Sequence, residues 1–239
     1  MSLETPIAKT SEKPPEQMLK EPTGRRDYLL AFLSACGMLA PVLYVITWIV
    51  AGLLYPGYNQ LTQATSELTS KVAPTIVAGV ANFGGYALGL LLIAFAFGLY
   101  RGVRRSRWLL IGTILVGLFG LICVIQPFFP TDPGAANHAF QNMMHDAVYV
   151  ISGVALIPGL LVLSVAFTRD PRLRPYRWYT LITPVLILLA GVDVGLFPSG
   201  VPERLSTLAL LIWFEVVAFR LLRLAFQREP APGAESRDV

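Results

Sequence analysis

Both histidines of the chain lie in one polar segment, which also contains Asp132. An imidazole can act as a general base, and a carboxylate can orient it for the hydrolysis or transfer of a group. We therefore expect His145 and His138 to be the candidate catalytic residues, with Asp132 as an orienting group. An earlier polar segment adds Ser66 and Glu67 to the candidates. If these side chains meet, they form a site for water and a polar substrate.

A zinc ion is an alternative use of the same groups, with His138, His145 and Asp132 as ligands. The two histidines are seven residues apart, about 10 Å along a helix, so one helix cannot present both to one ion. They could meet only if the helix begins after His138. No HExxH spacing is present, so zinc stays an open alternative. Cys36 and Cys123 lie at different expected depths in their helices, about 10 and 22 Å, and should not form a disulfide.

Polar residues continue from this segment into the apolar stretch that follows it. They recur three, four and seven residues apart, which places them on one face of a helix. Such a stripe should face protein or water, because lipid cannot satisfy its hydrogen bonds. The stripe comprises His138, Gln141, Asn142, His145, Tyr149 and Ser152.

Two acids, Asp193 and Glu215, lie inside apolar segments. A carboxylate in hydrocarbon costs about 3 kcal/mol on insertion scales, so both should point into a bundle of helices. They could be hydrogen-bonded structural acids or members of a proton relay. Their candidate partners are Asn82, Gln126 and Arg220; together with Tyr149, Asn82 and Gln126 would support a pocket.

The elements that position these residues are membrane-spanning helices. Only 14% of the 239 residues are charged and the mean hydropathy is +0.59, which excludes an ordinary water-soluble domain. A helix needs about 20 apolar residues to cross the hydrocarbon core. We therefore predict an all-α, polytopic bundle of six transmembrane helices within residues 29–226. The expected spans are 29–54, 74–100, 108–128, 145–168, 178–197 and 205–224.

The basic residues predict the orientation of the bundle. All but Lys71 and Arg204 of the 19 basic residues fall in the two tails, near the C-terminal end of the last span or in alternate connections. The positive-inside rule then places both termini in the cytoplasm. The tails, 1–28 and 227–239, are expected to be disordered because they contain few large apolar residues. Basic patches without interleaved aromatic residues predict no nucleic-acid partner.

The first external loop is expected to form a short amphipathic helix. Leu61, Ala64, Leu68 and Val72 recur at helical spacing. Glu67 and Lys71 would then form an i,i+4 pair, while Ser66 and Glu67 would fold over the mouth of the bundle. Tyr58 and Asn59 would brace the preceding turn. The alternative is a solvated helix without a role in a pocket.

Several short motifs resemble the bacterial integral-membrane family catalogued as domain of unknown function 998. The resemblance covers about residues 28–226 and implies about six helices, a bacterial inner membrane location and no agreed activity. It implies that any hallmark site includes Ser66, Glu67, Asp132, His138 and His145, whereas Asp193 and Glu215 match no part of the pattern. The motifs are Cys36-Gly37 with Pro41, Tyr58, Ser66-Glu67-Leu68, Asn82, Phe129-Pro130-Thr131-Asp132, His138 and His145.

Three classes of function remain. The first is a binding protein whose extracytoplasmic polar pocket holds a lipid headgroup, a small amphiphile or a partner membrane protein. The second is a membrane-embedded, metal-dependent or metal-free hydrolase or transferase that acts on a lipid. The third is a small proton-coupled transporter that uses Asp193 and Glu215. The inner halves of the spans are almost entirely apolar, which argues against transport.

Overall fold

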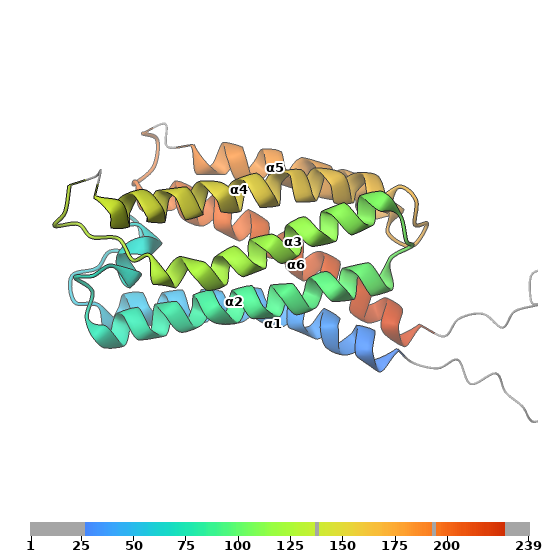
Figure 1. The fold of residues 1–239 in the computed structure, drawn as a ribbon, viewed down its shortest axis with the longest axis horizontal. Coiled ribbons are helices and arrows are strands. Elements are labelled where there is room, and N and C mark those ends of the chain that lie inside the picture. The colour runs from blue at the N-terminus through green and yellow to red at the C-terminus, as the bar shows by residue number, and fades with distance from the viewer. Residues whose placement is uncertain (1–26, 137–138, 193–194, 228–239) are drawn as a thin grey trace, which may run out of the picture. The chain divides into compact units, whose positions relative to one another are not determined.

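The computed structural model describes residues 27–136, 139–192 and 195–227, which include six α-helices, three short 3₁₀ helices and no strand. Figure 1 shows the helices running along a common direction. The predicted tails fall almost entirely outside the described residues, as do His138 and Asp193. The α-helices are α1 (Tyr28–Leu54), α2 (Thr75–Gly102), α3 (Arg107–Ile125), α4 (Phe140–Phe167), α5 (Arg177–Gly191) and α6 (Gly200–Phe226); the 3₁₀ helices are η2 (Thr65–Thr69), η3 (Gln126–Phe128) and η4 (Arg174–Tyr176).

Five of these helices are long and apolar enough to cross a membrane: α1, α2, α3 with η3, α4 and α6. The chain is therefore an all-helical, multi-pass membrane protein. The fifth predicted span is wrong at its end, because α5 stops at Gly191 and not near residue 197. Its 15 residues extend about 22 Å, less than the roughly 30 Å of a hydrocarbon core.

Two helices begin earlier than predicted. The helix α4 begins at Phe140 and not at residue 145, and α6 begins at Gly200 and not at residue 205. Polar residues had set the predicted limits, but a helix can continue through polar sequence once it leaves the hydrocarbon. Asp146 is consequently in the second turn of α4.

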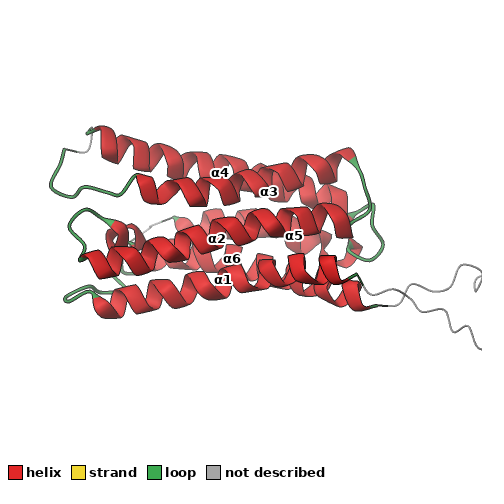
Figure 2. Ribbon diagram, turned by 60° about the horizontal axis from the view of Figure 1, so that its bottom comes forward, coloured by secondary structure: helices red, strands yellow, loops and turns green. Residues whose placement is uncertain are grey.

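The six helices pack in a closed order, in which each contacts the next along the chain and α6 returns to α1 (Figure 2). Phe214 of α6 lies in the core, with its ring centroid 6.0 Å from that of Phe95 on α2 and 6.3 Å from that of Phe119 on α3. The neighbouring Trp213 donates a hydrogen bond from Nε1 to Thr180 on α5 at 3.0 Å. These contacts join four of the six helices.

A pair of glycines brings α2 and α3 together. A Cβ atom on Gly89 would lie 2.4 Å from the carbonyl oxygen of Gly120, and one on Gly120 would lie 2.8 Å from that of Gly89. The two backbones therefore touch, as small residues permit between helices in lipid.

The bundle has two chemically different ends. The arginine-rich end comprises the start of α1, the end of α6 and the α2–α3 and α4–α5 connections. At this end, α1 is joined to α6 by a hydrogen bond from the Asp27 backbone N–H to the Ala225 carbonyl at 3.1 Å. The loop end comprises the connections between α1 and α2, α3 and α4, and α5 and α6. This arrangement matches the alternation of basic and non-basic connections in the sequence.

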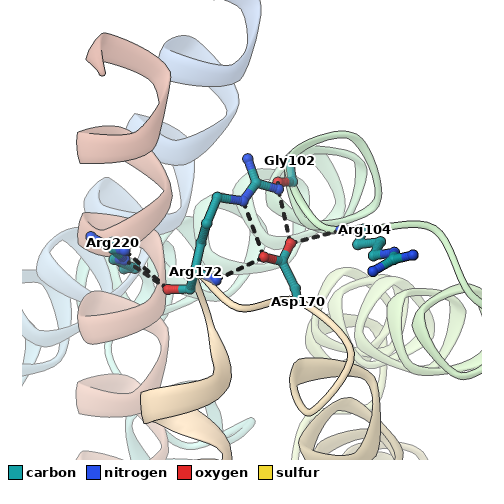
Figure 3. A network of polar contacts seen from close by, with 5 residues as sticks. All are labelled: Gly102, Arg104, Asp170, Arg172 and Arg220. Carbon is teal, nitrogen blue, oxygen red and sulfur yellow. Dashed lines mark hydrogen bonds and ion pairs between the residues drawn. The ribbon is translucent and has the colours of Figure 1, made fainter. Parts of the chain in front are cut away.

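Asp170 is the centre of the arginine-rich end (Figure 3). Its side chain is 1% exposed and accepts two hydrogen bonds from the Arg172 guanidinium, at 3.0 and 2.8 Å. The backbone N–H of Arg104 donates to it at 2.8 Å. Arg172 also donates to the Gly102 carbonyl at 2.9 Å, and Arg220 of α6 donates to the carbonyl of Arg172 at 3.0 Å. The Asp170 carboxylate thus links the α2–α3 and α4–α5 connections, and Arg220 attaches α6 to the same network through the backbone of Arg172.

The hydrogen bonds to Asp170 outweigh its burial. Burial raises the pKa of this carboxyl, but the hydrogen bonds from Arg172 and from the backbone N–H of Arg104 lower it further, to a value below the ordinary 3.8. Asp170 is therefore ionised in the folded protein at neutral pH. The basic residues of this end predicted the orientation of the bundle, but nothing in the sequence pattern pointed to the role of Asp170.

Asp170→Asn should lower the free energy of unfolding by about 2 kcal/mol, because the charged acceptor of these bonds is lost. Arg101→Gln is the control. It removes the exposed Arg101–Asp27 pair at 3.1 Å and should cost less than about 1 kcal/mol. Denaturation in detergent micelles at neutral pH measures both, and equal losses would contradict the central place of Asp170.

The effect should also depend on pH. A carboxyl whose pKa is depressed in the folded state stabilises the protein above its unfolded pKa, and this stabilisation disappears as the pH falls through the folded value. The difference between Asp170→Asn and the wild type should therefore be constant above about pH 5 and shrink below about pH 4. A difference that instead grew in acid would show that the depressed pKa is wrong.

Candidate functional site: a cavity at the loop end

A cavity of about 710 Å³ lies among the helices, in the half of the bundle nearer the loop end. All six helices and η2 line it. Of the residues predicted for a site, Ser66, Asn82, Gln126, His145 and Tyr149 are in its wall, whereas Glu67, Asp132 and Glu215 are not. The wall also contains Tyr44, Thr65, Asp146 and Glu203, which were not proposed as site residues.

His145 is held in one orientation by the preceding connection. It is 8% exposed, and its Nδ1 lies 2.8 Å from the carbonyl oxygen of Phe129. A carbonyl can only accept, so Nδ1 carries the proton and donates this hydrogen bond. In the neutral imidazole, Nε2 then keeps a lone pair that can accept a proton or bind a ligand.

Asp132 braces the loop and does not reach the cavity. Lys71 Nζ lies 3.0 Å from its carboxylate, and the Lys71 backbone N–H donates to the Thr131 carbonyl at 2.9 Å. Asn142 of α4 accepts from the Asp132 backbone N–H at 2.8 Å and donates to its carbonyl at 3.1 Å. The hydrogen bond from Lys71 lowers the pKa of Asp132 below its ordinary value. The predicted role of Asp132 as orienting partner of His145 is wrong, since Phe129 holds the imidazole.

The α1–α2 connection forms a shorter and tighter helix than expected. Residues Thr65–Thr69 form the 3₁₀ helix η2, in which Leu68 is buried. Glu67 accepts hydrogen bonds from Gln63 Nε2 at 2.6 Å and from the Ala64 backbone N–H at 3.1 Å. The predicted Glu67–Lys71 pair is therefore wrong, because Lys71 pairs with Asp132. Ser66 does line the cavity, whereas Glu67 fixes the turn beside it.

Glu203, in the first turn of α6, connects that helix to η2. Its carboxylate accepts a hydrogen bond from the Thr65 backbone N–H at 3.1 Å and another from the Thr65 hydroxyl. Both residues line the cavity. The sequence offered no sign of this pair, because 138 residues separate its members.

Arg204, the next residue, is a buried cation that is 7% exposed. No carboxylate in the described part of the chain is within ion-pair distance of it; its partners are neutral. The guanidinium also lies over the Trp48 ring, 5.2 Å from the centroid. It donates to the carbonyls of Gln63 and Gly200 at 2.7 Å each, to the Tyr58 hydroxyl at 2.7 Å and to Gln60 Oε1 at 3.1 Å.

The turn around Tyr58 depends on this cation. Tyr58 accepts from Arg204 and donates to the Ala64 carbonyl at 2.9 Å, while Asn59 accepts from the Leu61 backbone N–H at 2.8 Å. Burial raises the pKa of Tyr58 despite the neighbouring Arg204. The hydroxyl is therefore neutral and can both donate and accept. The prediction that Tyr58 and Asn59 brace the turn is confirmed.

Asn82 of α2 contributes an unused hydrogen-bond acceptor to the cavity wall. Its Oδ1 is shielded from solvent and has no hydrogen-bond partner among the described residues. Native proteins rarely bury such an atom without a reason, and a bound ligand is one such reason.

Glu215 of α6 resembles Asn82 in one respect, since its Oε1 is also sheltered and without a partner in the described ranges. It lies outside the cavity wall, and the structure shows no hydrogen bond to its expected partners Asn82, Gln126 or Arg220. Arg220 instead binds the carbonyl of Arg172.

A metal centre receives no support from the described residues, among which no three His, Cys, Asp or Glu side chains gather closely enough to hold an ion. The set predicted for zinc contains His138, which lies outside them, as does Asp193, one of the two acids predicted to lie inside the bundle. Cys36 and Cys123 are both buried and free, as expected.

The family described as protein of unknown function, DUF998, matches residues 38–220. This range includes the cavity-lining parts of all six helices. No curated protein and no solved structure matches the chain.

Arg204→Lys should loosen the turn over residues 58–64, because an ammonium group cannot reach four separated acceptors as a guanidinium does. Hydrogen exchange followed by mass spectrometry should show faster exchange of the backbone amides in this segment, by about tenfold or more. Arg101→Lys, at the other end of the bundle, is the matched control and should leave the turn unchanged. Wild-type protection of 58–64 in Arg204→Lys would show that Arg204 does not hold the turn.

Proposed function

The chain belongs to the DUF998 family, and we propose that this member is a six-span membrane protein that binds an amphiphile in the cavity at its loop end. The cavity wall carries the proposal. About 710 Å³ is within the usual range for sites that hold one small ligand, and the wall combines apolar side chains with polar groups from several helices. An amphiphile needs both kinds of contact.

The proposed orientation rests on the two ends of the bundle. Arginines concentrate at the end that holds the α2–α3 and α4–α5 connections, whereas Lys71 and Arg204 are the basic residues of the loop end. By the positive-inside rule, the arginine-rich end and both termini are cytoplasmic, and the cavity is in the outer half of a bacterial inner membrane. Membrane lipids are then the nearest source of an amphiphile.

The path of α5 supports the proposed sixth span. It begins beside the Asp170 network of the arginine-rich end, and the chain after it reaches the loop end, where the Gly200 N–H donates to the Leu61 carbonyl at 2.9 Å. The segment from Arg177 to Gly200 thus traverses the bundle, although its helix is short. Six crossings keep both termini on one side.

His145 supports a second function, hydrolysis or group transfer on a bound lipid. Its Nδ1–H is committed to Phe129, so the lone pair of Nε2 is free to act as a general base at the cavity. Zinc at this position would need a further ligand, for which His138 remains a hypothesis. Nothing favours proton-coupled transport to the same degree, because Glu215 is not in the cavity wall.

Asn82→Leu provides a test, since it removes the unpartnered acceptor at nearly constant size. The variant should fold with unchanged or higher thermal stability and should hold at least about tenfold less of the bound amphiphile. The amphiphile that co-purifies with the detergent-solubilised protein is extracted and quantified by mass spectrometry.

Thr113→Val is the matched control. Its hydroxyl bonds the Leu109 carbonyl at 2.9 Å within α3, away from the cavity wall, so its bound amphiphile should equal that of the wild type. A folded wild type that carries no amphiphile, or an Asn82→Leu variant that carries the wild-type amount, would refute the proposal.

A further inference from the structure

The cavity reaches the molecular surface on one side, between α4 and the end of α5. Four of its lining residues are 55–60% exposed: Tyr149, Val150, Leu188 and Val192. Residues that both line a cavity and face outward mark an opening. Three of the four are aliphatic, so this rim suits contact with acyl chains better than contact with water.

The short α5 explains why the opening lies there. The helix ends at Gly191, whereas α4 continues further toward the loop end (Figure 1). Gly153 of α4 lies in the cavity wall, and no atom is within 4 Å of the position that a Cβ atom would take there. At Gly153, α4 thus lacks the close packing that the glycines of α2 and α3 show.

The charges around the cavity select the head group. The wall contains the carboxylates of Glu203 and Asp146 and, in the described ranges, no lysine or arginine. The nearest loop-end cations are engaged elsewhere, Arg204 with the 58–64 turn and Lys71 with Asp132. A negatively charged head group would therefore be repelled at low dielectric constant.

Several polar groups of the wall can accept hydrogen bonds from a ligand. The Asn82 Oδ1 has no partner among the described residues, the Nε2 of a neutral His145 keeps its lone pair, and the carboxylates of Asp146 and Glu203 can only accept. A hydroxyl or ammonium group supplies such donors, whereas a carboxylate or a phosphate diester does not.

We propose that a long-chain alcohol or amine enters the cavity sideways from the bilayer, between α4 and the end of α5, and places its hydrogen-bond-donating head group against Asn82, His145 and Glu203. This inference rests on the proposed binding function and names the class of ligand and its route.

Three radiolabelled probes with the same chain test the head group: hexadecylamine, hexadecanol and hexadecanoate. Each is titrated onto the full-length protein in zwitterionic nanodiscs, with empty nanodiscs as the background. The amine and the alcohol should saturate at one per chain and bind at least about tenfold more tightly than the carboxylate. Asp146→Asn, which removes an exposed carboxylate, should reduce the preference for the amine over hexadecanoate.

Gly153→Phe tests the route, because the aromatic ring would fill the opening. It should weaken binding of hexadecanol by about tenfold. Gly79→Phe is the matched control, since Gly79 of α2 also has no atom within 4 Å of its would-be Cβ position but lies outside the cavity wall. It should bind as the wild type does, and thermal midpoints confirm that both variants fold.

The possible results distinguish a failure of the proposed amphiphile binding from a failure of the proposed ligand class or entry route. If none of the probes binds the wild type, both are overturned. If hexadecanoate binds as tightly as the other two, amphiphile binding stands and the head-group assignment is wrong. If a folded Gly153→Phe binds like Gly79→Phe, the sideways route is wrong. The head-group comparison needs no variant, so it decides the ligand class even if Gly153→Phe fails to fold.

Discussion

The loop end of this protein depends on one buried cation. Arg204 lies in the first turns of α6 and holds the 58–64 turn in place by donating hydrogen bonds to neutral oxygen atoms of that turn. The Trp48 ring on α1 covers its other side. Burial of an arginine is costly unless its donors are satisfied, so the turn is constrained to the path that supplies acceptors to the two terminal nitrogens, whereas Nε has no hydrogen-bond partner among the described residues. Along this path η2 lies in the cavity wall, where the Thr65 backbone N–H donates a hydrogen bond to the Glu203 carboxylate.

The two ends use charge in different ways. At the arginine-rich end, the Asp170 carboxylate joins the α2–α3 connection to the α4–α5 connection, and the Arg172 guanidinium that it binds also reaches the end of α2. At the loop end, the charged contacts are the Lys71–Asp132 pair and the hydrogen bonds of Arg204, and none of these three residues lines the cavity. The polar groups of the cavity wall, such as those of Asn82 and His145, take no part in these charged contacts.

The sequence predicted the parts of this structure that follow from local patterns. Hydropathy located the helices, and the spacing of the polar stripe placed His145 and Tyr149 on one face, where both line the cavity. Contacts between distant segments could not be read in this way. Asp132 pairs with Lys71, which is 61 residues away in the chain. The helix α5 ends at Gly191, although the apolar sequence continues without a polar residue until Asp193. Helical periodicity predicts neither this ion pair nor the position at which α5 ends.

The most direct test of the account locates a bound amphiphile in the protein. Hexadecanol that carries a diazirine in its chain is added to the wild type in nanodiscs, irradiated, and the labelled peptides are identified by mass spectrometry. The account predicts labels concentrated on cavity-lining positions of α4 and α6, such as Leu156 and Leu210, and competition by unlabelled hexadecanol. Labels spread over the exposed lipid-facing residues of all helices, without competition, would contradict it.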